Sequence, residues 1–178
     1  MRFGPDIECG LGAAVDLVNA GAEGLPDLDT LAEFAADHHL GAHGPLGDRD
    51  LRQVHALRSR LAAILGAGDP DTVAELINGV LAGAHTTPRL RRHDGFDWHI
   101  DHFAPGATLA EHLGVTTAMA LATLFADGEF DRIRSCAAPG CERLLVDLSR
   151  NRSRRYCAGR NCGNRLHVAA YRERNRVS

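Results

Sequence analysis

Apolar residues recur at steps of three and four over much of the chain up to position 130, which is the spacing of one face of an α-helix. The clearest run begins at Asp48 and places Val54, Leu57 and Leu61 on one such face. Helices are therefore predicted wherever this pattern returns between loops rich in glycine, proline and aspartate. They cover 11–20, 31–40, 48–65, 71–84 and most of 105–128. The last of these is apolar almost without a break and is expected to be the central helix of the core.

The second predicted helix carries signals at both of its ends. Asp29 or Thr30 is expected to cap its first turn, and Glu33 is placed to complete a capping box behind Thr30. Gly41 follows the last residue of the apolar pattern and is expected to end the helix.

The helical spacing breaks down over 88–104, where a small β-hairpin is predicted instead. Asp94–Gly95 is a dipeptide typical of the tight turn of a hairpin. Trp98, Ile100 and Phe103 are residue types that favour strands. The segment is therefore expected to form two short paired strands within a mainly helical domain.

Asp97, His99 and Asp101 alternate with these apolar residues, so they share one side of the second predicted strand. Such a row fits a second metal or acid–base site, and it fits equally well the solvent-facing side of an ordinary hairpin. An enzyme with a site near His99 and Asp101 is therefore kept as an alternative. We expect no catalytic activity, because the sequence contains no phosphate loop, nucleophile elbow or His-Glu zincin motif.

Four of the five cysteines lie close together near the C-terminus, as two C-x4-C pairs separated by fifteen residues. A disulfide framework and a metal site are the two explanations. Acidic residues interrupt the N-terminal segment, which therefore does not read as a signal peptide, and a cytoplasmic, reducing setting is expected. Structural disulfides are rare in that setting, and an odd number of cysteines fits them poorly. We predict one structural zinc ion held by Cys136, Cys141, Cys157 and Cys162.

The residues around the cysteines predict how this region folds. Pro139–Gly140 and Gly159 lie inside the two C-x4-C pairs and favour tight turns there. Residues 144–146 and 154–157 resemble the two strands of a hairpin, and a helix is expected after Cys162. Turn, hairpin, turn and helix is the plan of a treble-clef-like zinc module. A segment so poor in large apolar residues needs such a metal staple to fold.

The formal net charge of -3 conceals two halves of opposite sign. Residues 1–130 carry 8 arginines against 19 acidic residues, a balance of -11, and residues 131–178 carry 12 arginines against 4 acidic residues, a balance of +8. All 20 basic residues are arginine. We therefore predict a helical domain, 1–130, followed by a basic zinc module, 131–178, that has a partner of its own.

Short motifs in both halves resemble a known family. In the basic half, "DLSRN" (147–151), "RRYC" (154–157) and "CGNR" (162–165) resemble the CGNR zinc-finger proteins. In the helical half, "VDLVNA" (15–20) and "LIN" (76–78) resemble the ABATE domain that precedes this finger. The family is described as stress-induced transcription regulators. The resemblance implies a predominantly α-helical body and a DNA-binding finger.

Arginines in the basic half are the candidate contacts to nucleic acid. Arg165, Arg172 and Arg176 lie at i, i+7 and i+11 of the predicted last helix, so the later two fall within about 20° of the direction of the first. Leu166, Ala169 and Ala170 form an adjacent apolar strip that is expected to pack on the hairpin or the body. The predicted nucleic-acid contacts are Arg150, Arg152, Arg154, Arg155, Asn164, Arg165, Arg172 and Arg176.

These features together predict a zinc-dependent DNA-binding protein, a transcription regulator with a helical sensing or assembly domain. DNA is the expected partner and RNA a second choice, while a homodimer and a small-molecule effector stay open. No membrane partner is expected, because no apolar run approaches the roughly 18–20 residues of a membrane span. The alternative from another class is a protein-interaction adaptor, whose basic zinc arm docks on acidic protein surfaces.

Overall fold

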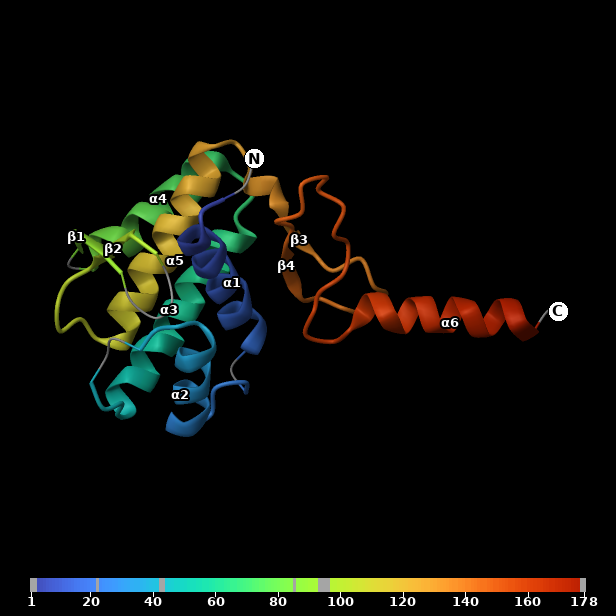
Figure 1. Cartoon of the computed structure of the whole chain (residues 1–178), viewed down its shortest axis with the longest axis horizontal. Coiled ribbons are helices and arrows are strands. Elements are labelled where there is room, and N and C mark those ends of the chain that lie inside the picture. The colour runs from blue at the N-terminus through green and yellow to red at the C-terminus, as the bar shows by residue number, and fades with distance from the viewer. Residues whose placement is uncertain (1–2, 22, 42–43, 85, 93–96, 177–178) are drawn as a thin grey trace. The chain divides into compact units, whose positions relative to one another are not determined.

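The computed structural model describes residues 3–21, 23–41, 44–84, 86–92 and 97–176. The chain divides into two compact units, one made of Phe3–Phe130 and one that begins at Asp131 (Figure 1). The first unit is helical with one small hairpin, and the second holds the four clustered cysteines. The prediction of a mainly α-helical protein is confirmed. The division into two domains, 1–130 and 131–178, with separate roles stays a prediction.

Five α-helices and one two-stranded sheet make up the described part of the first unit, which we call the helical unit. In chain order they are α1 (Pro5–Ala20), α2 (Leu28–Asp37), α3 (Asp48–Gly66), α4 (Pro70–Ala82), β1 (Thr86–Arg91), β2 (His99–Phe103) and α5 (Leu109–Ala126).

α5 is the central helix of this unit, as its apolar sequence predicted. It packs against α1, α3, α4 and β2, and Leu113, Leu121 and Leu124 along it are completely buried (Figure 1). Among the described residues, α5 is the one helix long and apolar enough to cross a membrane, and 56% of it is buried inside the protein. Burial on this scale is what the central helix of a packed core requires.

The crossing of α1 and α5 depends on the absence of a side chain at Gly10. A methyl group added there would lie 2.7 Å from the Thr116 carbonyl oxygen and 2.8 Å from Cβ of Ala120. A methyl group added at Gly12 on the same helix would meet nothing within 4 Å. Glycine is therefore required for packing at the first position and only weakens the helix at the second.

The same substitution to alanine is predicted to change the stability of the helical unit in opposite directions at these two glycines. Gly12→Ala is expected to stabilise the helical unit by about 0.5–1 kcal/mol, because alanine loses less backbone entropy in a helix. Gly10→Ala is expected to destabilise it by about 1–3 kcal/mol, because the added methyl overpacks the crossing. Thermal unfolding followed by far-ultraviolet circular dichroism measures both. Shifts of the same sign would show that the two helices do not cross this closely.

The ends of α2 differ from the prediction. Its N-cap is Asp27, whose carboxylate accepts from the Thr30 backbone N–H at 2.9 Å, and the Thr30 side chain completes the capping box. Neither Asp29 nor Glu33 takes the predicted role. The helix ends at Asp37 rather than at Gly41, because the chain leaves helical geometry at His38. The third residue of this capping box is Thr30 and not the expected glutamate, so the helix starts earlier than predicted.

The predicted hairpin is present, with β1 and β2 antiparallel and Leu90 opposite Ile100. The predicted turn at Asp94–Gly95 lies outside the described residues. The orientation of the hairpin is inverted relative to an ordinary solvent-exposed one. Leu90, Trp98 and Ile100 face outward and are 66%, 62% and 52% exposed, whereas Asp101 is only 6% exposed. The polar side of β2 therefore faces the interior, and its interpretation as a solvent-facing side is wrong.

The second unit, which we call the zinc unit, has little regular structure apart from its last helix. Its described elements are η1 (Phe130–Arg132), which crosses the unit boundary, β3 (Ile133–Ser135), β4 (Leu144–Val146) and α6 (Cys162–Arg176).

The hairpin of the zinc unit is not the one predicted. Residues 144–146 do form a strand, but β4 pairs with β3, Ile133 lying opposite Val146, and residues 154–157 form no strand. The loop between β3 and β4 therefore contains the first C-x4-C pair. The cause is the acidic residue after β4, Asp147, whose side chain takes up the backbone N–H groups of the following loop, as described below.

α6 extends from the second cysteine pair and is exposed over most of its length. Within the zinc unit, Leu166 is half-buried, whereas Ala169, Val168 and Tyr171 are exposed. Packing of the predicted apolar strip on the helical unit stays a prediction.

Candidate metal centre

Each C-x4-C pair contains a tight turn closed by a backbone hydrogen bond. In the first, the Cys141 backbone N–H donates to the Ala138 carbonyl at 3.1 Å, and Gly140 has φ +69°. In the second, the Asn161 backbone N–H donates to the Ala158 carbonyl at 2.9 Å, and Asn161 has φ +47°. Both turns thus place a left-handed residue directly before the second cysteine. Glycine and asparagine are the residues that tolerate this conformation best.

Gly159 lies in the second turn, as predicted, but the left-handed residue of that turn is Asn161. A methyl group added at Gly159 would lie 2.8 Å from Nη2 of Arg143, so the glycine makes room for the Arg143 guanidinium. The signal for Asn161 was present in the sequence, because asparagine is the second choice after glycine for a left-handed position.

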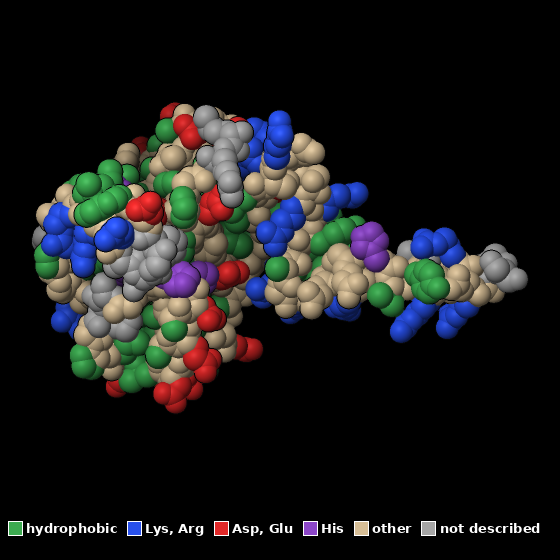
Figure 2. Space-filling view, viewed as in Figure 1, with side chains coloured by type: hydrophobic (Ala, Val, Ile, Leu, Met, Phe, Trp, Pro, Cys, Tyr) green, Lys and Arg blue, Asp and Glu red, His purple; other side chains and the backbone are tan. Residues whose placement is uncertain are grey.

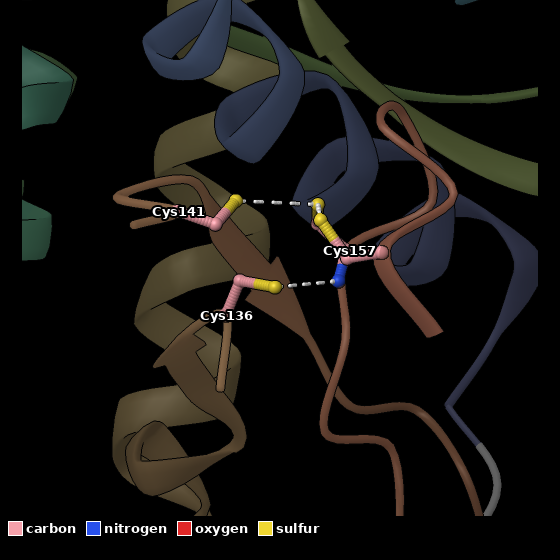
Figure 3. A group of neighbouring side chains, drawn as sticks. Cys136, Cys141 and Cys157 are labelled. Atoms are coloured by element: carbon pink, nitrogen blue, oxygen red, sulfur yellow. Dashed lines mark hydrogen bonds between the residues drawn. The ribbon is translucent and has the colours of Figure 1, made fainter. Parts of the chain in front are cut away.

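The two turns bring the four cysteine sulfurs together, and Figure 3 shows three of them converging. All four Sγ atoms lie within 4.8 Å of one another, the Cys141–Cys157 pair at 3.8 Å and the Cys157–Cys162 pair at 3.7 Å. Zinc tetrahedra have Zn–S bonds of about 2.3 Å, which places their sulfurs about 3.8 Å apart. The spacing is far too long for a disulfide, and all five cysteines are free.

The burial and hydrogen bonding of these thiols favour binding of a cation. Burial by itself raises the pKa of Cys136, but hydrogen bonds from the backbone N–H groups of Cys157 and Ala138 lower the pKa to about 7. The Cys157 N–H lies 3.3 Å from Cys136 Sγ (Figure 3). Burial, followed by the hydrogen bonds and charges of the other thiols, raises the pKa of Cys162 to about 12. Four thiolates can therefore coexist here only around a metal ion.

The donor set fits one structural zinc ion held by Cys136, Cys141, Cys157 and Cys162. When bound, zinc would cross-link the two turns. It would offer no open position for a reacting group, because four thiolates fill its coordination shell. Three of the four cysteines are buried, and together with Leu145 they form the hydrophobic cluster at the metal site, against which Tyr156 packs. The metal ligands are thus also the centre of this small fold.

The loop between β4 and the second cysteine pair is organised by Asp147, whose side chain is completely buried. Its carboxylate accepts from the backbone N–H groups of Ser149 at 3.0 Å and Arg154 at 2.9 Å, and Nη2 of Arg134 lies 3.5 Å away. Burial would raise the pKa of Asp147, but the hydrogen bonds from Ser149 and Arg154 and the Arg134 charge hold it below its usual range. The sequence analysis missed this residue, although it lies in the "DLSRN" motif.

Asp147→Asn is expected to destabilise the zinc unit by about 2–3 kcal/mol. An amide has one oxygen in place of two, so one N–H donor of the loop is left facing an NH2 group. The readout is the urea concentration at which the protein releases zinc to a colorimetric chelator. Because the carboxyl pKa is lowered on folding, its stabilisation is present above about pH 4 and is lost as the pH falls through the folded value.

The matched control for Asp147→Asn is Asp131→Asn in the same unit. Asp131 is exposed and pairs with Arg152 at 2.9 Å, and a surface ion pair of this kind contributes less than about 1 kcal/mol. Equal effects of the two substitutions would contradict the assignment of Asp147 as the organiser of the loop.

All eight predicted nucleic-acid contacts are exposed side chains of the zinc unit. Asn164, Arg165, Arg172 and Arg176 lie on α6, and the other four lie in the loop between β4 and Cys157. Arg152 is also engaged within its own unit, by the ion pair with Asp131. The remaining predicted loop arginines are Arg150, Arg154 and Arg155. The structure therefore keeps both groups accessible, one on the helix and one on the loop.

Figure 2 shows how charge is distributed over each unit. Separate arginine side chains are spread over the visible face of the zinc unit and lie on both sides of α6, whereas acidic side chains gather over the end of the helical unit that holds α2. The charge asymmetry of the sequence is thus carried by surface side chains. Buried cationic groups account for little of it, since Arg132 is the one buried arginine among the described residues.

Comparison with known families adds two findings. A model of the CGNR zinc finger matches residues 132–175. A model of the ABATE domain, described as "putative stress-induced transcription regulator", matches residues 11–128, which is well over half of the chain. The two matches follow one another in the predicted order. No curated protein matches the chain.

Proposed function

Because the chain belongs to the ABATE family and carries a CGNR zinc finger, we propose that it is a DNA-binding transcription regulator whose zinc unit contacts the nucleic acid. The observation that supports this most directly is the accessible arginine surface on a metal-stapled unit with a formal charge of +8. Zinc coordinated by four thiolates contributes -2 to that total when the thiols ionise, which leaves the unit strongly positive.

α6 is the element best suited to enter a groove. Its 15 residues span about 22 Å, and almost all of its described side chains are exposed, as a helix that enters the major groove requires. Arg165, Arg172 and Arg176 line one side of it, where they can neutralise phosphates. Asn164 and Arg165, in its first turn, are the side chains proposed to reach base edges.

The loop between β4 and Cys157 is the second proposed contact. Arg150, Arg154 and Arg155 are exposed there, and the loop is held in shape by Asp147 rather than by the arginines themselves. Arginines on a loop fixed in this way can bind phosphates without a large ordering cost. Zinc dependence follows, because loss of the metal would release both the loop and the start of α6.

We propose a regulatory role without catalysis, in an intracellular setting. A closed four-thiolate site offers no coordination position for a substrate or an activated water. Within the described residues, the four cysteines are the one group of metal-binding side chains that gathers closely enough to hold an ion.

The proposal is tested by fluorescence anisotropy of a labelled mixed-sequence DNA duplex titrated with the full chain. Zinc-loaded protein is expected to bind and chelator-treated protein to lose binding. A labelled RNA duplex in parallel distinguishes the two nucleic acids. Zinc-loaded protein that binds neither, but is retained by an acidic protein surface, would favour the adaptor alternative instead.

A further inference from the structure

The helical unit contains a cavity of about 390 Å³ that the DNA-binding proposal does not use. It is bounded by the start of α1, by residues 38–40 after α2, by β2 and by α5. Ligand-binding cavities in proteins span about 300–1,000 Å³, so its size fits a small organic molecule. All of these elements belong to one unit, so the cavity does not depend on how the two units are arranged.

One end of the cavity is polar because the β1–β2 hairpin is inverted. His99 and Asp101 face inward, with His99 Nε2 3.2 Å from Asp101 Oδ1, and Arg91 Nε lies 3.4 Å from the other carboxylate oxygen. His99 Nδ1 also lies 2.8 Å from the Asp97 carbonyl oxygen. Burying such groups costs free energy unless they are well paired. An ordinary hairpin would bury Leu90, Trp98 and Ile100, so this orientation has a cost that packing does not explain.

Most of the rest of the cavity wall is apolar, although His38, His39, His102 and His112 also line it. Ile7 from α1, Leu40 after α2 and Met119 from α5 line it, together with Phe103 at the end of β2. The Phe103 ring stacks on His112 of α5, with ring centroids 3.6 Å apart, which fixes the wall between β2 and α5. An apolar wall with a few convergent polar groups at one end is the usual character of a small-molecule site.

The charges around the cavity select against a charged ligand. Two carboxylates, Asp6 and Asp101, line it, and no arginine does, so an anion would be repelled. Both oxygens of Asp101 are already paired with His99 and Arg91, which offsets the attraction of this carboxylate for a cation. Burial lowers the pKa of His38, another lining residue, which keeps that ring neutral near pH 7. A neutral molecule therefore meets the least electrostatic cost.

From this arrangement we propose that the cavity binds a neutral, largely apolar small organic molecule with one hydrogen-bonding end. The apolar body lies against Ile7, Leu40 and Met119, and the hydrogen-bonding end lies toward His99 and Asp101. Both ring nitrogens of His99 are engaged by Asp101 and Asp97, but each Asp101 carboxylate oxygen can accept a second hydrogen bond, so a hydroxyl group, which donates, matches this end of the cavity.

The charge selectivity is tested with ligands that share one apolar body. The fluorescent neutral probe N-phenyl-1-naphthylamine is bound to the zinc-loaded full chain and displaced by 1-octanol, octanoate or octylamine at pH 7. 1-Octanol is expected to displace the probe at a concentration at least about tenfold lower than the two charged compounds, because only they must lose the hydration of a charge. Equal displacement by all three, or stronger displacement by a charged one, would overturn the proposal.

The location is tested by a matched pair of substitutions on α5. Thr116→Phe places a ring at a half-buried position that lines the cavity and is expected to weaken probe binding at least about tenfold. Thr123→Phe makes the same change two turns along, at a half-buried position outside the cavity lining, and is expected to leave binding unchanged. Equal binding by both variants would show that the probe binds elsewhere.

Cys9 provides an independent readout, because it lines the cavity and its thiol donates to the His38 carbonyl oxygen at 3.6 Å. In zinc-loaded protein it is expected to be alkylated by iodoacetamide before the four clustered cysteines, although slowly, since burial and the neighbouring Asp6 raise its pKa. Saturating 1-octanol is expected to slow this alkylation severalfold, as measured by mass spectrometry. Wild-type protein in which 1-octanol does not protect Cys9 and the probe does not bind would overturn the proposal. None of these measurements involves DNA, so their failure leaves the DNA-binding proposal untouched.

Discussion

Cys157→Ser is expected to abolish zinc binding and to unfold the zinc unit while the helical unit stays folded. The hydrophobic cluster at the metal site of the zinc unit consists of Cys136, Cys157, Cys162 and Leu145, so three of its four buried members are metal ligands. Apparent binding free energies of structural zinc sites reach roughly 10–16 kcal/mol, which is comparable to the whole stability of a typical domain. Without the ion, the apolar contacts that remain are too few to order the unit.

The measurement combines zinc content, circular dichroism and limited proteolysis. The variant should contain no zinc, retain most of its helical signal and be cleaved rapidly after residue 131. Ala158→Ser is the control, because it changes an exposed neighbour of the ligand and should leave all three readouts at their wild-type values. A variant that still binds one zinc per chain, or a helical unit that unfolds together with the zinc unit, would contradict the expected result.

The second large effect is expected from removing two arginines of α6. In the double variant Arg172→Ala/Arg176→Ala, the affinity for a DNA duplex should fall roughly 60-fold at about 0.1 M salt, since each lost phosphate contact removes a factor of about eight. The loss should be similar on all DNA sequences, because contacts to phosphates carry no sequence information. Both side chains are exposed, and alanine favours helices, so the fold of α6 should not change.

A control with the same change in charge lies on the helical unit. Arg49→Ala/Arg52→Ala removes two exposed arginines from α3 and should leave the affinity for DNA within about twofold of the wild-type value. Both double variants must retain one zinc per chain. If the two pairs reduced binding equally, binding would reflect total charge and not α6.

The metal site could be predicted from the sequence because it depends on local spacing. The tight turn inside each C-x4-C pair, with a left-handed residue directly before the second cysteine, decides where the sulfurs point, and both the spacing and the residues Gly140 and Asn161 are visible in the sequence. The pairing of β4 could not be predicted in the same way. The buried carboxylate of Asp147 binds the backbone N–H groups of Ser149 and of Arg154, the first residue of the predicted strand 154–157, and no short-range pattern reveals that an aspartate will be buried.

The orientation of the β1–β2 hairpin shows another limit. Alternation along β2 correctly placed His99 and Asp101 on one side, but the pattern alone cannot say which side faces the core. If the polar side had faced solvent, Trp98 and Ile100 would have been buried, and the structure exposes both. Such a reversal of the usual preference is found where function opposes packing, and here it lines the cavity with polar groups.

The most direct test of DNA binding through the zinc unit is the salt dependence of the affinity of the zinc-loaded full chain for a mixed-sequence duplex. If α6 and the Asp147 loop together neutralise about five phosphates, the slope of log affinity against log salt should be near -4 to -5. Protein with no measurable affinity at about 50 mM salt, where counterion release is most favourable, would contradict DNA binding by this unit.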